Sequence, residues 1–328
     1  MTLTKKFIFP LCVLTLVLIC VFLCSCEKSL FYEDVPPKDN IITFTDSTGA
    51  EVTLEQKPER VAVLFSSFAE IWQLAGGEVI TTVGETVERG FASENAVLVD
   101  SGAGHSVIDV EALIASEPDF VVGTADYAGQ VEAVEICRKS GIPAALFRVE
   151  TFEDYLSMLS VFCEITHCED RYETYGEAVK MRVEKAKEKA SLLAEKAGEP
   201  PSILFLRAGS SDRSTKAKTA EDNFVCAMLS ELGCKNVAEK NGALIGELSL
   251  EAVIEENPSY LFITTMGNEQ AATEHMQTML AKEGWRELDC VKSGSYYFLP
   301  RELFHFKPNA RWDEAYEYLI SILYPEAN

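Results

Sequence analysis

Arginine and aromatic residues follow several short apolar segments of this chain, at the points where strands would end. Arg148 and Arg207 come most directly after such segments. Guanidinium groups bind anionic oxygens through paired, charge-assisted hydrogen bonds, and aromatic rings cover the flat organic part of a ligand. Ligands of parallel α/β proteins lie at the carboxyl ends of the strands. The sequence therefore predicts a site for an anionic small molecule, lined by Ser66, Arg89, Tyr127, Arg148, Arg207, Met266, Phe304 and His305.

The same strand ends carry further candidates, and no motif for catalysis stands beside them. The further residues are Ser67, Phe91, Arg213, Lys216 and Lys307. For each arginine the alternative stays open that it is solvated or paired with a nearby carboxylate. Ser210 and Ser211 stand in A-G-S-S-D, which is not the G-x-S-x-G pattern of a nucleophile elbow. Residues 102–106 read G-A-G-H-S and lack the third glycine of a dinucleotide-binding loop. We therefore predict a binding protein rather than an enzyme.

Two stretches of the chain, 140 residues apart, share one pattern. Residues 109–122 read D-V-E-A-L-I-A-S-E-P-D-F-V-V, and residues 249–262 read S-L-E-A-V-I-E-E-N-P-S-Y-L-F. In each stretch a short polar residue suits a helix N-cap, a proline ends the helix, and an apolar strand follows. The separation is far longer than a solenoid period, so the pattern predicts a duplicated lobe in which Glu111 and Glu251 occupy matching positions.

Strands and helices alternate on both sides of a long charged segment. The segment from Glu169 to Ala197 is interrupted only by Gly176, so it is predicted to form one helix that joins two lobes. A hairpin is predicted at residues 41–54, and Ser67 and Glu70 have the spacing of a capping box. The alternation predicts the α/β class, with two Rossmann-like lobes whose sheets are mainly parallel.

The N-terminal segment has the composition of a targeting peptide. Met1–Ser25 combines two lysines with an apolar run, and L-C-S-C, which ends at Cys26, looks like a lipobox. Lipid on Cys26 would anchor the mature chain; an uncleaved membrane anchor is the alternative, and both place the remainder outside the cytoplasm. The predicted parts are a signal peptide at 1–25, a tether at 26–40, lobes at 41–167 and 199–328, and an interlobe helix at 168–198.

Charge and cysteine usage exclude several kinds of partner. The whole chain has a formal net charge of −23, and the mature chain has −25, from 27 basic and 52 acidic residues. So acidic a chain argues against binding to nucleic acid or to an anionic membrane face, and it suits a partner with basic side chains. The six cysteines after Cys26 lack C-x-x-C spacing, and the four histidines are scattered, so a zinc site is not expected. One bridge, Cys163–Cys168 or Cys226–Cys234, stays open.

The order of these features resembles one known family. The chain combines a lipobox, a short hairpin, the doubled glutamate–proline motif and a long joining helix. It also contains the stretch R-V-A-V-L-F-S-S-F-A-E and the ending W-R-E-L-D-C-V-K-S-G-S-Y-Y-F-L-P. Over about residues 41–324 they resemble the substrate-binding proteins of ABC importers for iron-siderophores, haem and cobalamin. The resemblance implies a helical-backbone periplasmic binding protein fold, with ligand held between the lobes and only modest closure.

The resemblance also implies partners and roles. In that family the glutamate at this motif in each lobe pairs with arginines of the permease, which assigns docking to Glu111 and Glu251; a purely helix-stabilising role is the alternative. Arginines at strand ends favour a ferric siderophore as ligand. Haem or cobalamin is the alternative, with His305 or Tyr127 facing the metal, although His305 could instead pack locally. The implied partners are an ABC permease and its ATPase, and the implied protein is a monomer without a cofactor. A surface sensor or an enzyme on the same fold is the remaining alternative.

Overall fold

The first lobe is built on a five-stranded parallel sheet. The computed structural model describes residues 41–100 and 107–325. The strand order is β5-β4-β3-β6-β7, and each neighbouring pair is parallel. Every residue of β3, β4, β6 and β7 is buried, as a sheet covered by helices on both sides requires. The strands are β3 (Val61–Val63), β4 (Thr81–Thr82), β5 (Val97–Leu98), β6 (Phe120–Thr124) and β7 (Ala144–Phe147).

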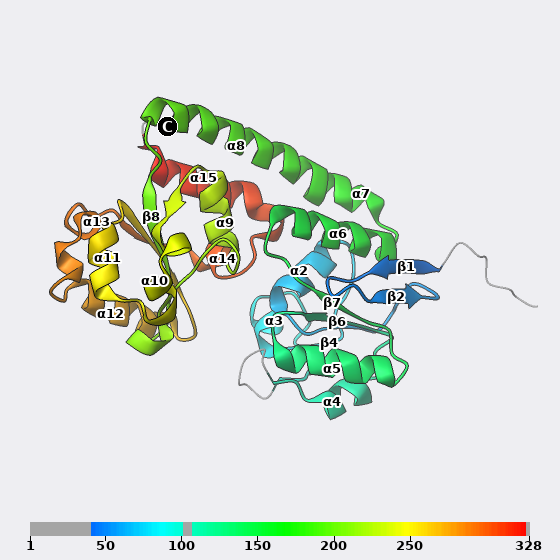
Figure 1. Cartoon of the computed structure of the whole chain (residues 1–328). Coiled ribbons are helices and arrows are strands. Elements are labelled where there is room, and N and C mark those ends of the chain that lie inside the picture. The colour runs from blue at the N-terminus through cyan, green and yellow to red at the C-terminus, as the bar shows by residue number, and fades with distance from the viewer. Residues whose placement is uncertain (1–40, 101–106, 326–328) are drawn as a thin grey trace, which may run out of the picture. The chain divides into compact units, whose positions relative to one another are not determined.

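Helices cover both faces of this sheet (Figure 1). On one face, Phe68 and Trp72 of α2 pack with Phe162 of α6 in the largest buried cluster. On the other face, Leu113 of α4 and Val134 of α5 belong to a separate cluster. The helices are α2 (Ser66–Leu74), α3 (Gly84–Glu88), α4 (Val110–Ala115), α5 (Ala128–Lys139) and α6 (Phe152–Thr166).

The predicted hairpin is confirmed as β1 (Ile42–Thr45) and β2 (Glu51–Leu54), which pair antiparallel. Its turn is fastened to the sheet by the buried carboxylate of Asp46. This side chain accepts hydrogen bonds from the backbone of Ala50 and Leu146 and forms an ion pair with Arg138. The hairpin is therefore part of the first lobe.

A second five-stranded sheet forms the second lobe. The order β10-β8-β11-β12 is parallel, and β9 pairs antiparallel with β8. Side chains of β8 alternate between two cores: Phe205 faces the largest cluster, whereas Leu204 and Leu206 face another. The strands are β8 (Ser202–Ala208), β9 (Lys216–Ala217), β10 (Lys235–Asn236), β11 (Tyr260–Thr265) and β12 (Tyr296–Phe298).

The helices of the second lobe again lie on both faces of its sheet (Figure 1). They are α9 (Phe224–Glu231), α10 (Gly242–Glu247), α11 (Leu250–Glu256), α12 (Glu269–Leu280), α13 (Asp289–Lys292), α14 (Arg301–Phe304) and α15 (Trp312–Leu323). Four short 3₁₀ turns join them: η3 (Asp212–Ser214), η4 (Val237–Lys240), η5 (Trp285–Glu287) and η6 (Asn309–Arg311). Together with the first lobe, this architecture confirms the predicted α/β class.

A continuous helical run connects the two sheets. It consists of α7 (Glu169–Tyr172), a π-helical turn η2 (Glu173–Glu177) and α8 (Ala178–Ala197). One stripe of α8 is buried, including Val179 and Val183, and Figure 1 shows α15 running beside it. The run ends at Gly198, whose φ of 84° suits only glycine without strain.

The two lobes share one apolar core as well as the helix. Trp312, at the start of α15, contacts Phe152 of the first lobe at 5.8 Å and Phe224 of the second at 5.7 Å between ring centroids. Both contacts have the edge-to-face geometry that aromatic pairs favour. Side chains at the start of α15 therefore pack the two lobes together, in addition to the link through α8.

The capping predictions had different outcomes. The doubled caps are confirmed: the Asp109 side chain accepts from the backbone N–H of Ala112 at 3.0 Å, and the Ser249 side chain accepts from Ala252 at 3.4 Å. The capping box at Ser67 was wrong. Helix α2 begins at Ser66 with Phe65 as its N-cap, so Ser67 lies inside the first turn and no side chain caps the helix.

The described residues test the candidate disulfides, but they do not include the predicted targeting segment. All six cysteines after residue 40 are free thiols, so neither candidate bridge forms. Within residues 41–100 and 107–325, no helix is long and apolar enough to cross a membrane. The predicted targeting segment and Cys26 lie outside the described residues.

Candidate functional site

A cavity of about 700 Å³ opens where the carboxyl ends of both sheets meet. Residues after β3, β6 and β7 contribute from the first lobe, and residues of β8, β11 and the loop after α14 contribute from the second. This is the position at which parallel α/β sheets hold ligands. Its lining comprises Phe65, Ser67, Glu85, Asp126, Tyr127, Arg148, Glu150, Arg207, Lys218, Glu221, Asp222, Asn223, Phe224, Thr264, Met266, Gly267, Arg301, Phe304, His305, Phe306 and Lys307.

The structure brings most of the predicted ligand residues together around this cavity. Those that line it are Tyr127, Arg148, Arg207, Met266, Phe304 and His305, with Ser67 and Lys307 from the further candidates. Two predicted residues lie behind the lining instead. Ser66 is fully buried and donates a hydrogen bond to Glu85, and Arg89 is held in an ion pair. Phe91, Arg213 and Lys216 do not line the cavity either.

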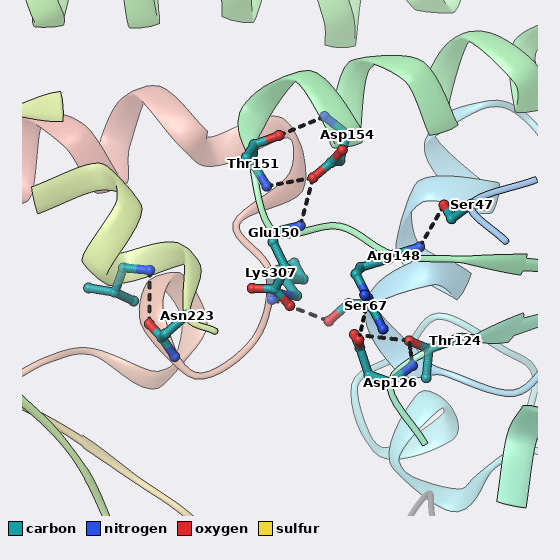
Figure 2. A network of polar contacts seen from close by, with 11 residues as sticks. Ser47, Ser67, Thr124, Asp126, Arg148, Glu150, Thr151, Asp154, Asn223 and Lys307 are labelled. Carbon is teal, nitrogen blue, oxygen red and sulfur yellow. Dashed lines mark hydrogen bonds and ion pairs between the residues drawn. The ribbon is translucent and has the colours of Figure 1, made fainter. Parts of the chain in front are cut away.

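The wall from the first lobe carries a paired arginine. Arg148 Nε lies 2.7 Å from Asp126 Oδ1, and the Arg148 backbone donates to Ser47 at 2.9 Å (Figure 2). Asp126 also accepts a hydrogen bond from the hydroxyl of Thr124. Arg148 is therefore already neutralised, as the alternative reading for loop arginines allowed.

An ion pair crosses from one lobe to the other along this wall. Lys307 Nζ lies 2.9 Å from Glu150 Oε1, and the Lys307 backbone donates to Ser67 Oγ at 3.3 Å (Figure 2). The lysine nitrogen also lies 4.9 Å from the centre of the Phe224 ring, where a cation–π attraction operates. Asp154, through the capping box of α6, holds the backbone of Glu150 at 3.0 Å.

The wall from the second lobe carries two less satisfied arginines and a histidine. Arg301 Nε lies 3.6 Å from Glu269, but its buried Nη1 has no hydrogen-bond partner. The Arg207 backbone pairs with β11 and β9, whereas its side chain has no ion-pair or hydrogen-bond partner among residues 41–100 and 107–325. Burial, assisted by both guanidinium groups, lowers the pKa of His305 to about 4. The imidazole is therefore neutral at pH 7.

Charge is distributed differently inside the cavity and over the chain. The lining contains five cationic and five acidic residues, whereas the whole chain has a formal net charge of −23. Three of the cations, Arg148, Lys218 and Lys307, have a carboxylate within 2.9 Å. The unpaired positive charge is thus concentrated on the second-lobe wall.

A buried polar cluster, here called the interlobe joint, lies beneath this cavity. It comprises Glu70 and Arg89 of the first lobe and Phe306 and Asn309 of the second. Arg89 Nη2 lies 3.2 Å from Glu70 Oε2, and its guanidinium lies 3.9 Å from the centre of the Phe306 ring. Asn309 donates to Glu70 and to the Ser67 backbone, both at 2.9 Å. The joint fixes the segment that presents His305 and Lys307 to the cavity.

Sequence reasoning missed several residues of this site. Asp126, Glu150, Arg301 and Phe306 line the cavity, yet none was singled out. Glu150 lies two residues after Arg148, which places it on the same side of an extended segment. That signal was available in the sequence. No local signal marks Phe306 as the partner of Arg89, because the two are 217 residues apart.

Possible metal ligands are sparse in this part of the chain. Among residues 41–100 and 107–325, no group of three or more His, Cys, Asp and Glu side chains is arranged to hold a metal ion. The cavity instead presents hydrogen-bond donors, one neutral imidazole and aromatic rings. Two lobes around such a cavity define a binding protein for a small molecule.

Comparison with known proteins supports that class. A family model described as periplasmic binding protein matches residues 61–303. Because the match covers most of the chain, the chain belongs to the periplasmic binding protein family. This confirms the family predicted from the order of its motifs.

Individual relatives are more distant. The chain is 23% identical over 318 residues to a Bacillus subtilis (strain 168) protein named "Uncharacterized ABC transporter substrate-binding lipoprotein YvrC", covering 95% of this chain and 96% of that one. It resembles the periplasmic heme-binding protein RhuT from Roseiflexus sp. RS-1 (TM-score 0.66, 19% identity, 82% of this chain and 99% of that chain). It also resembles Staphylococcus aureus SirA complexed with staphyloferrin B (TM-score 0.66, 16% identity, 86% and 98%). At these identities the two structures establish the fold alone.

The interlobe joint makes a stability prediction. Arg89 is 11% exposed and Glu70 17% exposed, so replacing Arg89 with Met leaves a carboxylate buried without its cation. Removing one partner of a buried pair costs about 3 kcal/mol of unfolding free energy, which urea denaturation would measure. The matched control is Arg286→Met, because Arg286 is 60% exposed and forms an ion pair with exposed Glu287. Equal stability of the two variants would contradict the role of the joint.

Proposed function

We propose that this chain is the substrate-binding lipoprotein of an ABC importer, and that it captures a metal chelate, a ferric siderophore, in the cavity between its lobes. The observation that carries the proposal is the cavity itself. It is large enough for a small chelate, and it combines two incompletely paired arginines with aromatic rings inside a strongly acidic chain. Guanidinium groups suit the anionic oxygens of such a ligand. The names of the Bacillus subtilis relative and of the SirA complex support the same class.

Haem or cobalamin is the second candidate ligand, favoured by one specific observation. Tyr127 and neutral His305 both line the cavity, and the buried Nδ1 of His305 has no hydrogen-bond partner. An unprotonated imidazole nitrogen is the form that binds metal. The likeness to RhuT, a heme-binding protein by its title, adds to this candidate. Ferric siderophore remains our first choice because two guanidinium groups lie beside that imidazole.

A thermal-shift panel tests the proposed function. The purified mature protein would be heated with haem, cyanocobalamin or ferric siderophores of the catecholate, hydroxamate and carboxylate classes. A ligand at 100 times its dissociation constant stabilises the folded state by about 2.7 kcal/mol, which raises the Tm by roughly 5 °C for a chain of this size. We expect that rise with at least one ferric siderophore. A shift with cobalamin or haem alone would overturn the choice of ligand, and no shift with any chelate would contradict the function.

We further propose that Glu111 and Glu251 dock the importer's permease. Each lies in the first turn of a capped helix, is exposed, and has no partner within the described part of the chain. One helical turn further on, each is followed by an exposed isoleucine: Ile114 is 36% and Ile254 46% exposed. The same combination on both lobes suits a two-pronged contact with basic residues on the permease.

A double substitution tests the docking proposal. Glu111→Ala with Glu251→Ala should abolish transport into cells or reconstituted vesicles while leaving chelate affinity unchanged, because neither residue lines the cavity. The matched control is Glu188→Ala with Glu195→Ala, two exposed glutamates on α8. If transport survives in the first variant, the docking role is wrong.

The proposal also assigns the parts of the chain. Residues 1–25 act as a lipoprotein signal, Cys26 carries the lipid, and 26–40 form a tether outside the cytoplasm. The lobes are 41–167 and 199–328, with 168–198 joining them. Membrane fractionation of a Cys26→Ser variant tests the anchor, since the variant should leave the membrane fraction. Retention there would favour an uncleaved anchor instead.

A further inference from the structure

Two cysteines stand five residues apart at the corner where α6 leads into α7, the start of the helical run between the lobes (Figure 1). Both are free thiols, so the structure shows their reduced state. We propose that Cys163 and Cys168 form an oxidation site, which a disulfide oxidant converts to a bridge while Cys226 and Cys234 stay reduced. The inference goes beyond the proposed function. It uses the proposed location outside the cytoplasm, where dithiols meet oxidants, and it does not depend on the ligand.

The end of helix α6 brings the two cysteines together. His167 has left-handed backbone angles, with φ of 57° and ψ of 41°. The N–H of Cys168 donates to the carbonyl oxygen of Cys163 at 3.0 Å, and the N–H of His167 donates to that of Glu164 at 3.2 Å. These two bonds across a left-handed residue define a Schellman motif. Cys163 and Cys168 occupy the two positions of that motif whose side chains contact each other.

The backbone bond between the cysteines also limits the distance that a bridge must span. With standard bond lengths, an N–H···O bond of this length keeps the Cα atoms of its two residues within about 6.5 Å. Disulfides join Cα atoms that are about 4.4–6.8 Å apart. Neighbouring contacts hold the corner in place: Thr166 Oγ1 donates to the Ala75 carbonyl at 2.6 Å, and Lys57 Nζ donates to the Thr166 carbonyl at 2.8 Å. Closing the bridge therefore requires side chains to rotate and leaves the backbone where it is.

The other candidate pair lacks this arrangement, although its helix ends in the same way. Helix α9 is followed by Gly233 with a φ of 84°, and the N–H of Cys234 donates to the Leu229 carbonyl at 2.9 Å. The motif therefore places Cys234 opposite a leucine. Cys226 lies three residues before that leucine, and its thiol lies 3.4 Å from the carbonyl oxygen of Lys218. Helix-end geometry thus selects one of the two pairs that the sequence left open.

The exposure of the two cysteines sets the order of the reaction. Cys168 is part-exposed, whereas Cys163 is 2% exposed. The Cys168 thiolate attacks the disulfide of the oxidant, forms a mixed disulfide and releases one thiol. Cys163 then attacks the Cys168 sulfur, and the second thiol leaves as the protein bridge forms. The protein loses two electrons and two protons, and the oxidant gains both.

The second step is the one in which Cys163 gives up its proton. Burial, followed by the neighbouring Cys168, raises the pKa of Cys163 to about 11, although the charge of Arg171 opposes that rise. At pH 7 Cys163 is therefore a neutral thiol until the mixed disulfide stands beside it.

Peptide mapping after oxidation tests the site. The full mature protein would be held folded in a buffer of oxidised and reduced glutathione, alkylated, digested and analysed by mass spectrometry. We expect a disulfide between Cys163 and Cys168, with the other four cysteines after residue 40 alkylated. Because the bridge closes a loop of six residues, it should raise the Tm by roughly 4 °C over the reduced protein. Refolding the reduced chain in the same buffer exposes both thiols to the oxidant. If neither treatment produces this bridge, the oxidation site is wrong.

Three substitutions provide controls. Cys168→Ser should abolish both the bridge and the rise in Tm, whereas Cys226→Ser should keep both. Leu229→Cys puts a cysteine opposite Cys234 in the second motif, so oxidation should form a bridge there. Thermal melts of the reduced variants establish that each one folds. A wild-type bridge between Cys226 and Cys234, or glutathione that remains attached to Cys168, would overturn the proposal.

The outcomes separate this inference from the proposed function. Neither cysteine of the site lines the cavity, so the bridged and reduced proteins should bind the same chelate with equal affinity. Failure of the bridge to form would leave chelate capture intact. Binding of no chelate by either form would contradict the proposed function and leave the oxidation site intact.

Discussion

The binding site depends on a charge that is buried where the two lobes meet. Arg89 is enclosed between Glu70 and the Phe306 ring, and Asn309 holds the same carboxylate from the opposite side. Burial raises the pKa of Glu70, although the hydrogen bond from Asn309 and the charge of Arg89 oppose that rise. Such a cluster tolerates no missing member, since each group is desolvated and satisfied only by the others. It therefore ties one loop of the second lobe to α2 of the first.

That constraint explains how residues far apart in the chain form one cavity. The loop held by the interlobe joint carries His305 and Lys307, which both line the cavity. His305 lies near the arginines of the second lobe, and Lys307 pairs with Glu150 of the first. The Lys307–Glu150 pair and the shared contacts of Trp312 add further connections between the lobes. With α8 as a second connection, the lobes are joined by packed side chains as well as by the chain itself. Such an arrangement favours a largely pre-formed site with modest closure.

The charges of the chain divide between its surface and its cavity. The surface is strongly acidic, which suits a basic docking partner and would disfavour an anionic ligand at long range. Within the cavity, three of the five acidic residues form ion pairs with two lysines and one arginine, and the incompletely paired arginines lie on the second-lobe wall. In the proposed function, short-range guanidinium contacts, which water screens little, would decide the choice of ligand, and the overall charge would govern the encounter with the partner.

Local patterns in the sequence predicted most of the fold. The caps at Asp109 and Ser249, the hairpin and the helix to Ala197 follow from nearby residues, and the structure contains all of them. Strand ends likewise indicated Tyr127 and five other residues that line the cavity.

The predictions failed where a distant partner decides the outcome. Ser67 and Glu70 have capping-box spacing, but Asn309 and Lys307 take their hydrogen-bonding groups. Arg89 follows a strand as a ligand residue would, yet Phe306 covers it. These contacts depend on how the second lobe packs against the first, which no local pattern encodes.

Hydrogen–deuterium exchange tests the central claim that one ligand is held by both lobes. The probe would be the ferric siderophore that gives the largest thermal shift. The structure predicts slower exchange at residues 126–127 and 148–150 of the first lobe and at 264–267 and 301–307 of the second, with no change in α4 or α11. Protection confined to one lobe, or protection of the helices that carry Glu111 and Glu251, would contradict it.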